Sequence, residues 1–472
     1  MQFQTLDFGL LVVATLLCFH LVRGRARVYV LIGASICFYS PWGILFLGLI
    51  AGSSSVDFFA GRAIHRLESK ALRPALLMLS LCVNLSILAW FKYANFFLDN
   101  LRALLGPGQV LTAVDVILPP GISFYTFQSM SYTIDIYRRK IQPAKSFSAF
   151  LLYVSFFPQL VAGPIERAER LLPQFEHLAK IGAVRYRTLK PGLVLIVWGL
   201  AKKLLLADHL GVIADAAFAN PDSLGFWTAW LGTYAFTLQI YCDFSAYSEI
   251  AKGTALLFGI RLMWNFDQPY LASDPSDFWR RWHISLSDWF RDYVYIPLGG
   301  SRHGRGRAII NLSATMFLSG LWHGAAWTFV LWGMIHGVWL ALQAGLRSVP
   351  ALTALWTSGA PSRVRGFLKW FFFFHLVTLS WVPFRAGSFY DMLVVWEKML
   401  LVVPAALPTP LQWLGFGFVA VFLGSSTVHR KFQLERKLTD SGTTPLVLVA
   451  SLMILIALFG NRGVAEFIYF QF

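Results

Sequence analysis

Residues 308–345 read AIINLSATMFLSGLWHGAAWTFVLWGMIHGVWLALQAG and contain no Asp, Glu, Lys or Arg. A transmembrane helix needs about 20 consecutive, mostly apolar residues, so this run is longer than a single crossing requires. Comparable runs recur at approximately 7–22, 28–60, 75–97, 116–136, 146–164, 191–214, 225–260, 367–384, 391–424 and 445–460. The pattern predicts an all-α, polytopic membrane protein with about ten to twelve membrane helices, some of them re-entrant.

The composition agrees with a membrane protein, because 57% of the 472 residues are hydrophobic and only 14% are charged. The net charge of +16 is carried by short basic clusters between apolar runs. Such clusters are typical of cytoplasmic loops that lie against anionic membrane lipid, so nucleic-acid binding is not expected. No charged block is long enough for a soluble domain, and we therefore expect one membrane-embedded domain over 1–472.

The basic clusters also constrain the topology. The loops around Arg25 and Arg66 are both basic, so both are predicted to be cytoplasmic. The run 28–60 between them should then be a hairpin, bent near Pro41 and Gly43. The run 146–164 lies between further basic loops and is too short to cross twice, which predicts a re-entrant segment. The first run is followed by its basic cluster, as expected for a retained span and not for a cleaved signal.

Residues 279–293 place Trp282, Leu286, Trp289 and Tyr293 at helical spacing, with charged residues off that stripe. This pattern predicts an amphipathic helix at the membrane interface. On such a helix, His283 would lie on the side that faces the protein.

Two histidines stand within the uncharged run 308–345. His323 is a candidate for function, because an ionisable side chain at membrane depth is costly. The alternative is a neutral histidine that only hydrogen-bonds inside a packed bundle. His336 follows thirteen residues later, which on one straight helix places the two side chains roughly 140° apart. They should not share a site unless the helix is broken, at Gly324 or Gly333.

Several segments together resemble the bacterial alginate O-acetyltransferase branch of the membrane-bound O-acyltransferase superfamily. They are FYTFQSMSYTIDIYR, FFPQLVAGPIER, YCDFSAYSEIAKG, FWRRWHISLSDWFRDYVYIPLGGSR, LWHGAAWTFVLWGMIHG and FIYFQF. The resemblance extends from about residue 90 to the end and implies a catalytic core at approximately 90–345. It places the superfamily's WHG histidine on His323 and its second polar catalytic position on His283, which is commonly asparagine in eukaryotic relatives. His336 matches a further family histidine of less settled role.

Histidine suits acyl transfer from a thioester to a hydroxyl, because a neutral imidazole is a base at physiological pH. We expect His323 to take the hydroxyl proton, while His283 or an amide near Gly324 stabilises the oxyanion. Trp322 and Asp288 are expected to support these groups. No metal site is expected, and the GxSxG, P-loop and HExxH motifs are absent from the sequence. All four cysteines lie within or beside apolar runs and are interpreted as packing residues: Cys18, Cys37, Cys82 and Cys242.

Other polar residues in apolar surroundings are candidates for binding the acyl donor. Arg280 and Arg281 could meet donor phosphates, although an interfacial helix carries such residues in any case. The candidates for lining a donor tunnel are Asp243, Gln239, Glu249, Gln128 and Ser123. The alternative for these is hydrogen bonding between neighbouring helices. Lys202 and Lys203 are predicted to extend to the cytoplasmic interface.

The resemblance implies an enzyme of the bacterial inner membrane with no bound cofactor. Its donor would be cytoplasmic acetyl-CoA or an acetyl carrier, and its product an O-acetylated exopolysaccharide such as alginate or cellulose. The implied partners are a periplasmic Ser-His-Asp-type acetyltransferase and a polysaccharide synthesis and export complex. Two alternatives are a D-alanyl-teichoic-acid-type transferase, which shares the RWH and WHG motifs, and a transporter whose histidines relay protons.

Overall fold

The computed structural model describes residues 1–106, 112–178, 186–346, 362–401, 407–432, 444–461, 463 and 466–468. Within these ranges all regular structure is helical, and no strand occurs. The helices group into two compact units, which are residues 1–199 with 247–263 and residues 200–246 with 264–472. The all-α prediction is confirmed, while the single domain over 1–472 stays a prediction.

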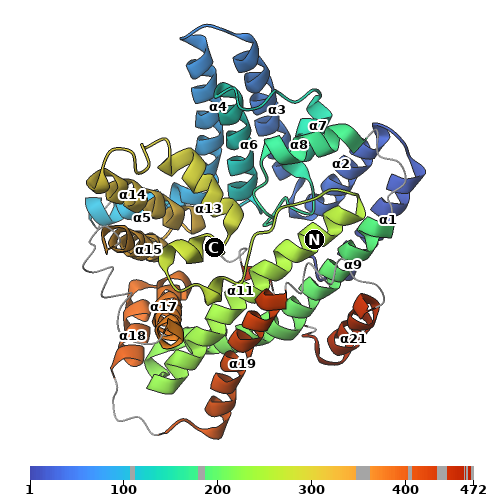
Figure 1. Ribbon diagram of the computed structural model, residues 1–472. Coiled ribbons are helices and arrows are strands. Elements are labelled where there is room, and N and C mark those ends of the chain that lie inside the picture. The colour runs from blue at the N-terminus through green and yellow to red at the C-terminus, as the bar shows by residue number, and fades with distance from the viewer. Residues whose placement is uncertain are drawn as a thin grey trace. The chain divides into compact units, whose positions relative to one another are not determined.

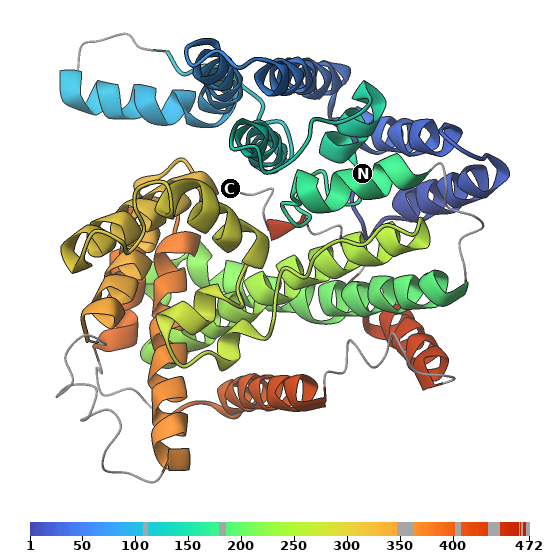
Figure 2. The same cartoon turned by 45° about the horizontal axis from the view of Figure 1, so that its top comes forward.

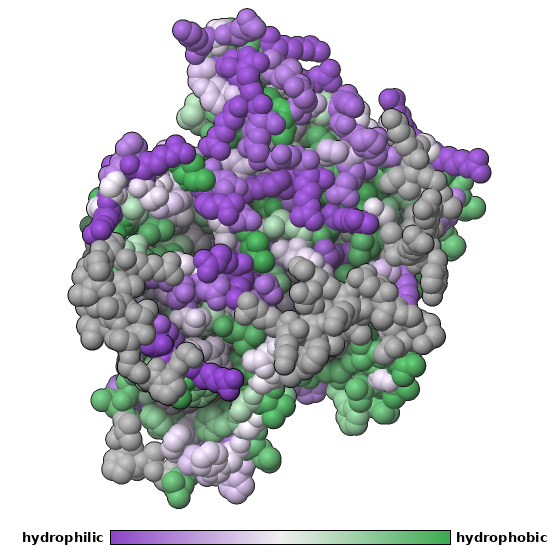
Figure 3. All heavy atoms as spheres, in the orientation of Figure 1, coloured by the Kyte–Doolittle hydropathy of each residue, from purple (hydrophilic) through white to green (hydrophobic). Residues whose placement is uncertain are grey.

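The helices of the first unit are α1 (Leu6–Leu21), α2 (Ala26–Tyr39), α3 (Ile44–Arg66), α4 (Leu72–Leu88), α5 (Ala94–Leu105), α6 (Ile122–Tyr137), α7 (Phe147–Ser155) and α8 (Ala168–His177). Figure 1 shows α3, α4 and α6 side by side, and Figure 2 looks more nearly along their axes. Hydrophilic side chains gather over the turn between α3 and α4, as expected for a water-facing loop (Figure 3). At Gly61 a Cβ would lie 2.9 Å from the Ile136 side chain, so α3 and α6 approach closely because this residue has no side chain.

The bend predicted in the run 28–60 is confirmed. Helix α2 ends at Tyr39, and α3 begins after Gly43, whose φ of 129° is one that other residues rarely adopt. The run 146–164 forms only the short α7, and residues 156–166 beyond it are entirely buried in protein. Protein therefore covers this irregular backbone, as a re-entrant segment requires, while its entry into a membrane stays a prediction.

A buried carboxylate that the sequence analysis did not single out joins three helices of the first unit. Asp57 on α3 is fully buried and accepts hydrogen bonds from Ser80 (2.5 Å) and Asn84 (2.9 Å) on α4 and from Ser129 on α6. Buried polar groups stabilise packing only when they are hydrogen-bonded. Asp57 therefore connects α3, α4 and α6 through polar contacts.

The second unit is formed mainly by α10 (Asp208–Ala219), α12 (Pro275–Trp279), α13 (Ile284–Phe290), α14 (Arg305–His323), α15 (Trp327–Leu346), α17 (Ser362–Arg385), α18 (Phe389–Leu400), α19 (Pro410–Phe432) and α21 (Thr444–Phe459). Helices α9 (Tyr186–Ala201) and α11 (Phe226–Leu257) contribute residues to both units. π-Helical turns occur at Ala89–Tyr93, Lys202–Ala207 and Arg291–Tyr295. The run 308–345 forms two helices, α14 and α15, which pack against each other (Figures 1 and 2).

Four helices in the described ranges are long and apolar enough to cross a membrane: Ile44–Arg66, Leu72–Leu105, Trp327–Leu346 and Arg363–Arg385. Shorter apolar helices are Leu6–Leu21 and Val447–Phe459. These helices fit the predicted polytopic membrane protein. The total of ten to twelve membrane segments stays a prediction.

Candidate active site

The break between α14 and α15 places His323 and His336 against the same indole ring. Helix α14 ends at His323, and the chain reverses before α15 begins at Trp327. A Cβ on Gly324 would lie 2.2 Å from the Phe329 ring, so the ring packs there only because residue 324 has no side chain. Of the two breaks considered from the sequence, the one at Gly324 is therefore present. His323 and His336 lie on two different helices, so the separation of roughly 140° expected on one straight helix is not present.

Two other glycines allow the backbones of α14 and α15 to touch. A Cβ on Gly320 would lie 2.3 Å from the Phe329 carbonyl oxygen, and one on Gly333 would lie 2.3 Å from the Met316 carbonyl oxygen. Backbone atoms cannot move aside as a flexible side chain does. The position of His323 relative to α15 therefore depends on Gly320 and Gly333.

We expect Gly333→Ala to lower the stability of the protein by about 1–3 kcal/mol, because the added methyl group overpacks a backbone contact. Acyl transfer should fall less than in the histidine variants, since the chemical groups remain. The measurement is the thermal unfolding midpoint in detergent. Gly345→Ala is the matched control, because it lies on the same helix and its Cβ would have no atom within 4 Å. Equal midpoints for the two variants would contradict the close contact.

His323 and His336 flank the indole ring of Trp332. The ring centroids lie 5.0 Å and 4.8 Å from that of Trp332, and both histidines are buried. The Nε2 atom of His336 lies 3.2 Å from the Ser380 hydroxyl, which donates to the Val377 carbonyl at 2.7 Å. Because the hydroxyl proton is used there, His336 Nε2–H is the donor to Ser380. His336 is thus hydrogen-bonded to α17.

His283 lies beside His323, at a second break in the chain. We call His283, His323 and His336 the histidine cluster. The predicted continuous helix over 279–293 is divided, because α12 ends at Trp279 and α13 begins at Ile284. His283 itself has φ 43° and ψ 55°, a left-handed conformation. Asn265 satisfies the first amides of α13, since its carbonyl accepts from Ile284 N (2.9 Å) and its side-chain oxygen from Ser285 N (3.2 Å). A turn over residues 280–283 therefore interrupts the expected helix.

The predicted apolar stripe packs inside the protein. Trp282 and Leu286 are fully buried, and Trp289 is 4% exposed. The expected orientation of His283 is confirmed, because its side chain is also fully buried.

The imidazoles of His283 and His323 lie close to each other. Their ring centroids are 6.3 Å apart, and that of Trp322 lies 5.9 Å from His283. An imidazole nitrogen acts on an atom within about 3 Å, so rings at this separation could both act on one acyl group that lies beside them. His283 lies outside the four candidate spans, and burial lowers its pKa to about 3. It is therefore a neutral imidazole at physiological pH.

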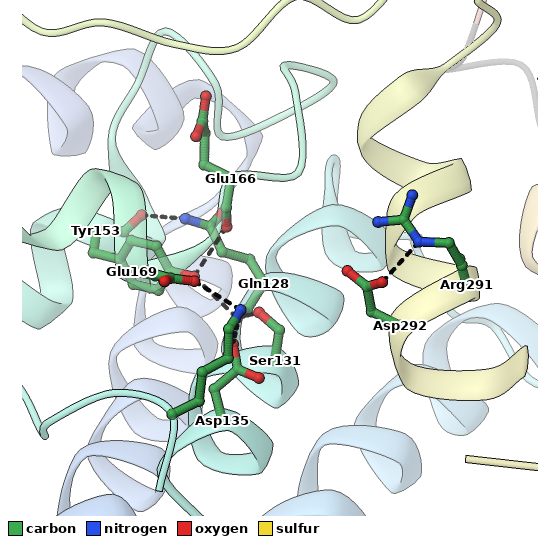
Figure 4. Close-up of polar contacts among 9 residues, drawn as sticks. Gln128, Ser131, Asp135, Tyr153, Glu166, Glu169, Arg291 and Asp292 are labelled. Atoms are coloured by element: carbon green, nitrogen blue, oxygen red, sulfur yellow. Dashed lines mark hydrogen bonds and ion pairs between the residues drawn. The ribbon is translucent and has the colours of Figure 1, made fainter. Parts of the chain in front are cut away.

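The other predicted supporting groups have partners of their own. The amide of Gly324 donates to the Gly320 carbonyl at 3.4 Å, which is long for a hydrogen bond. Asp288 forms an ion pair with Arg291 at 2.6 Å, and Arg291 also pairs with Asp292 at 2.9 Å (Figure 4). The expected roles of Gly324 and Asp288 toward the oxyanion and His283 stay predictions.

The two arginines considered for donor binding share one carboxylate. Asp277 is 3.3 Å from Arg280 and 2.9 Å from Arg281. Arg280 is exposed, whereas Arg281 is only 8% exposed. The exposed Arg280 is thus the more accessible of the two to a phosphate, and phosphate contact stays a prediction for both.

Lys203 corrects one prediction. It does not extend to an interface: its side chain is 7% exposed and its ammonium lies 2.9 Å from Asp208 and 2.8 Å from Asp243. Lys202 is half-buried, 3.3 Å from the Ser245 hydroxyl. The sequence indicates this ion pair, because carboxylates such as Asp208 and Asp243 in apolar runs usually require a cation.

Most of the tunnel candidates make helix–helix contacts. Asp243 pairs with Lys203, as described. Gln239 lies against Gly211, where a Cβ would be 2.8 Å from its amide nitrogen. In the first unit, Gln128 donates to the Tyr153 carbonyl at 2.6 Å (Figure 4), and Ser123 lies 3.5 Å from the Lys92 ammonium. Apart from that of Gln239, which is a packing contact, these contacts agree with the alternative of hydrogen bonding between helices, while a role in donor binding stays a prediction.

Metal chemistry has no candidate ligand set in the part of the chain that the structure describes. Those residues contain no group of three or more His, Cys, Asp and Glu side chains able to hold a metal ion. The histidine cluster consists instead of imidazoles among aromatic rings. Such a cluster suits proton transfer and hydrogen bonding at an acyl group.

Comparison with known proteins agrees with this geometry. Residues 76–386 match the model of the membrane-bound O-acyltransferase family. A probable alginate O-acetylase from Azotobacter vinelandii is 42% identical over 377 residues, covering 78% of this chain and 72% of the relative. A peptidoglycan O-acetyltransferase from Helicobacter pylori is 36% identical, with 78% and 73% covered. A teichoic acid D-alanyltransferase from Streptococcus thermophilus is 28% identical over 47% of this chain and 56% of its own length.

The family model covers well over half of the chain and includes the whole histidine cluster. The apolar helices supply the membrane character that the family requires. These findings set aside the transporter alternative. The chain therefore belongs to the membrane-bound O-acyltransferase family, as a multi-pass membrane acyltransferase.

Proposed function

We propose that this enzyme transfers acetyl groups for the O-acetylation of an exopolysaccharide, with alginate and cellulose as the leading polymers. The observation that carries the proposal is the buried pair of His323 and His283, 6.3 Å apart, within the family's matched region. The names of the relatives, an alginate O-acetylase and a peptidoglycan O-acetyltransferase, support acetyl as the group and a polysaccharide as the final acceptor.

In the proposed reaction, His323 takes the proton of an acceptor hydroxyl while the hydroxyl oxygen attacks the thioester carbonyl. His283, which is neutral, donates a hydrogen bond to the developing oxyanion. The tetrahedral intermediate then collapses, the carbon–sulfur bond breaks, and the thiolate takes the proton back from His323. The products are an oxygen ester and a free thiol, and no covalent enzyme intermediate is required.

The proposed donor is acetyl-CoA or an acetyl carrier on the cytoplasmic side of the inner membrane. The proposed acceptor is a hydroxyl on the other side, either on the polymer or on a periplasmic Ser-His-Asp-type acetyltransferase of the polysaccharide synthesis and export complex. The basic loops support the orientation, because Lys and Arg near span ends favour the cytoplasm.

A D-alanyl transferase is the second candidate, favoured by the match to the teichoic acid enzyme. That match covers less of the chain, at lower identity, than the match to the alginate O-acetylase. Acetyl is therefore the preferred acyl group.

Mass spectrometry of the extracellular polymer separates these candidates. Cells that express the protein should produce acetyl esters on their polysaccharide, and cells that lack it should not, with normal polymer yield in both. Isotope-labelled acetate should label the esters. D-alanyl esters in place of acetyl would select the second candidate, and equal acetylation in both strains would contradict the proposal.

A further inference from the structure

A short segment near the end of the chain is buried in the second unit. Phe467 is 3% exposed and Ile468 is 1% exposed. The Ile468 amide donates to one carboxylate oxygen of Asp243 on α11 at 2.7 Å. Upstream, the Asn461 amide donates to the Leu204 carbonyl at 3.1 Å. Residues 466–468 are thus held against α11 by a hydrogen bond to the Asp243 side chain.

The other oxygen of Asp243 belongs to a buried ionic cluster. Lys203 lies 2.8 Å from that oxygen and 2.9 Å from Asp208, and its ammonium also donates to the Glu466 carbonyl at 3.5 Å. The side chains of Asp208 and Asp243 are both 2% exposed. Charges in such surroundings are retained only where partners hold them in a defined geometry. We call Lys203, Asp208 and Asp243 the Lys203 cluster.

The same segment leads to the histidine pair through one aromatic ring. Phe244 follows Asp243 on α11, and its ring centroid lies 5.8 Å from Phe467 and 4.6 Å from His283. Phe244 and His283 meet edge to face, at 78° between their planes, which is a preferred geometry for aromatic pairs. Movement of Phe467 would therefore change the surface against which the His283 ring packs.

We propose that residues 466–468, held by the Lys203 cluster, form a positioning element of the active site that fixes the His283 imidazole through Phe244. The proposal rests on the proposed role of His283. It assigns Lys203 and Asp243 to positioning and not to the donor site, and it makes Phe467 and the Ile468 amide positioning groups that do not contact the acyl group.

Ile468→Pro tests the link, because proline has no amide proton to donate to Asp243. Ile468→Val is the matched control, since it keeps the amide and most of the side chain. In purified enzyme, Ile468→Pro should lower kcat by up to about 10²-fold with little change in KM for the thioester, as expected for a displaced catalytic group. Ile468→Val should stay within a few-fold of the parent. Phe467→Leu, which keeps the amide and removes the ring, should lower kcat in the same way.

A double-mutant cycle with His283→Ala separates positioning from general folding. If the segment acts through the imidazole, Ile468→Pro should add little to the defect of His283→Ala. Independent, multiplicative effects, or parent-like kcat in both Ile468→Pro and Phe467→Leu, would overturn the proposal. A failure of the proposed function gives a different result, because the parent enzyme itself would then transfer no acetyl group, and a failure of the proposed role of His283 would leave His283→Ala with parent activity. Unfolding midpoints show whether Ile468→Pro is folded, and Phe467→Leu supplies the answer if it is not.

Discussion

Replacing His323 with alanine should lower the rate of acyl transfer by about 10²- to 10⁴-fold, the usual contribution of general-base assistance. The protein should still be inserted and abundant, because alanine is a good helix former and keeps the end of α14 intact. The measurement is acetyl transfer from a labelled thioester by purified protein in detergent, together with the yield and unfolding midpoint of each variant.

His336→Ala is the matched comparison, and it should be milder than His323→Ala. The reason is the hydrogen bond from His336 to Ser380 on α17, which gives this imidazole a structural partner. If both histidines served only packing, expression and activity would fall together in both variants. Parent-like activity in a well-folded His323→Ala protein would exclude His323 as the base. Greater damage from His336→Ala would move the base to His336.

The helices can be predicted well from the sequence. The placement of His323 and His336 can be predicted only if a helix break is assumed. Apolar runs and basic clusters determine the bend before α3, because Pro41 and Gly43 stand between two basic loops. The contact of His323 and His336 with one indole ring depends on whether the helix breaks at Gly324. Glycine permits such a break without requiring it. The packing of Phe329 over Gly324 is a tertiary contact, so only the structure shows it.

The remaining features arise from residues that are distant in sequence. Helical spacing predicts one helix through His283, but Asn265, in a segment without regular secondary structure, supplies hydrogen bonds to the start of a second helix. Likewise, Lys203 in the apolar run 191–214 is predicted to extend to the interface, but its partner Asp243 lies on another helix. Local patterns do not show which segments become neighbours.

Two substitutions of His283 should distinguish the effect of its side-chain chemistry on the rate from the effect of its backbone conformation. The left-handed φ of 43° is unfavourable for alanine, whereas asparagine adopts this region more readily. His283→Ala therefore loses both a hydrogen-bond donor and a suitable conformation, and its rate should fall by about 10²- to 10³-fold, as for the loss of an oxyanion donor. His283→Asn keeps a donor and the conformation, and it should retain measurable activity.

The pH dependence of the His283→Asn enzyme gives an independent test of the role of His283. Burial lowers the pKa of His283 to about 3, so the ring is neutral at every pH above that value and does not titrate in the working range. Asparagine does not titrate either, so the variant should have a lower kcat and an unchanged acid limb in its pH–rate profile. A shifted or missing acid limb between about pH 5 and 8 would show that His283 exchanges a proton during turnover. His283 would then be a base, and the assignment of proton transfer to His323 alone would be wrong.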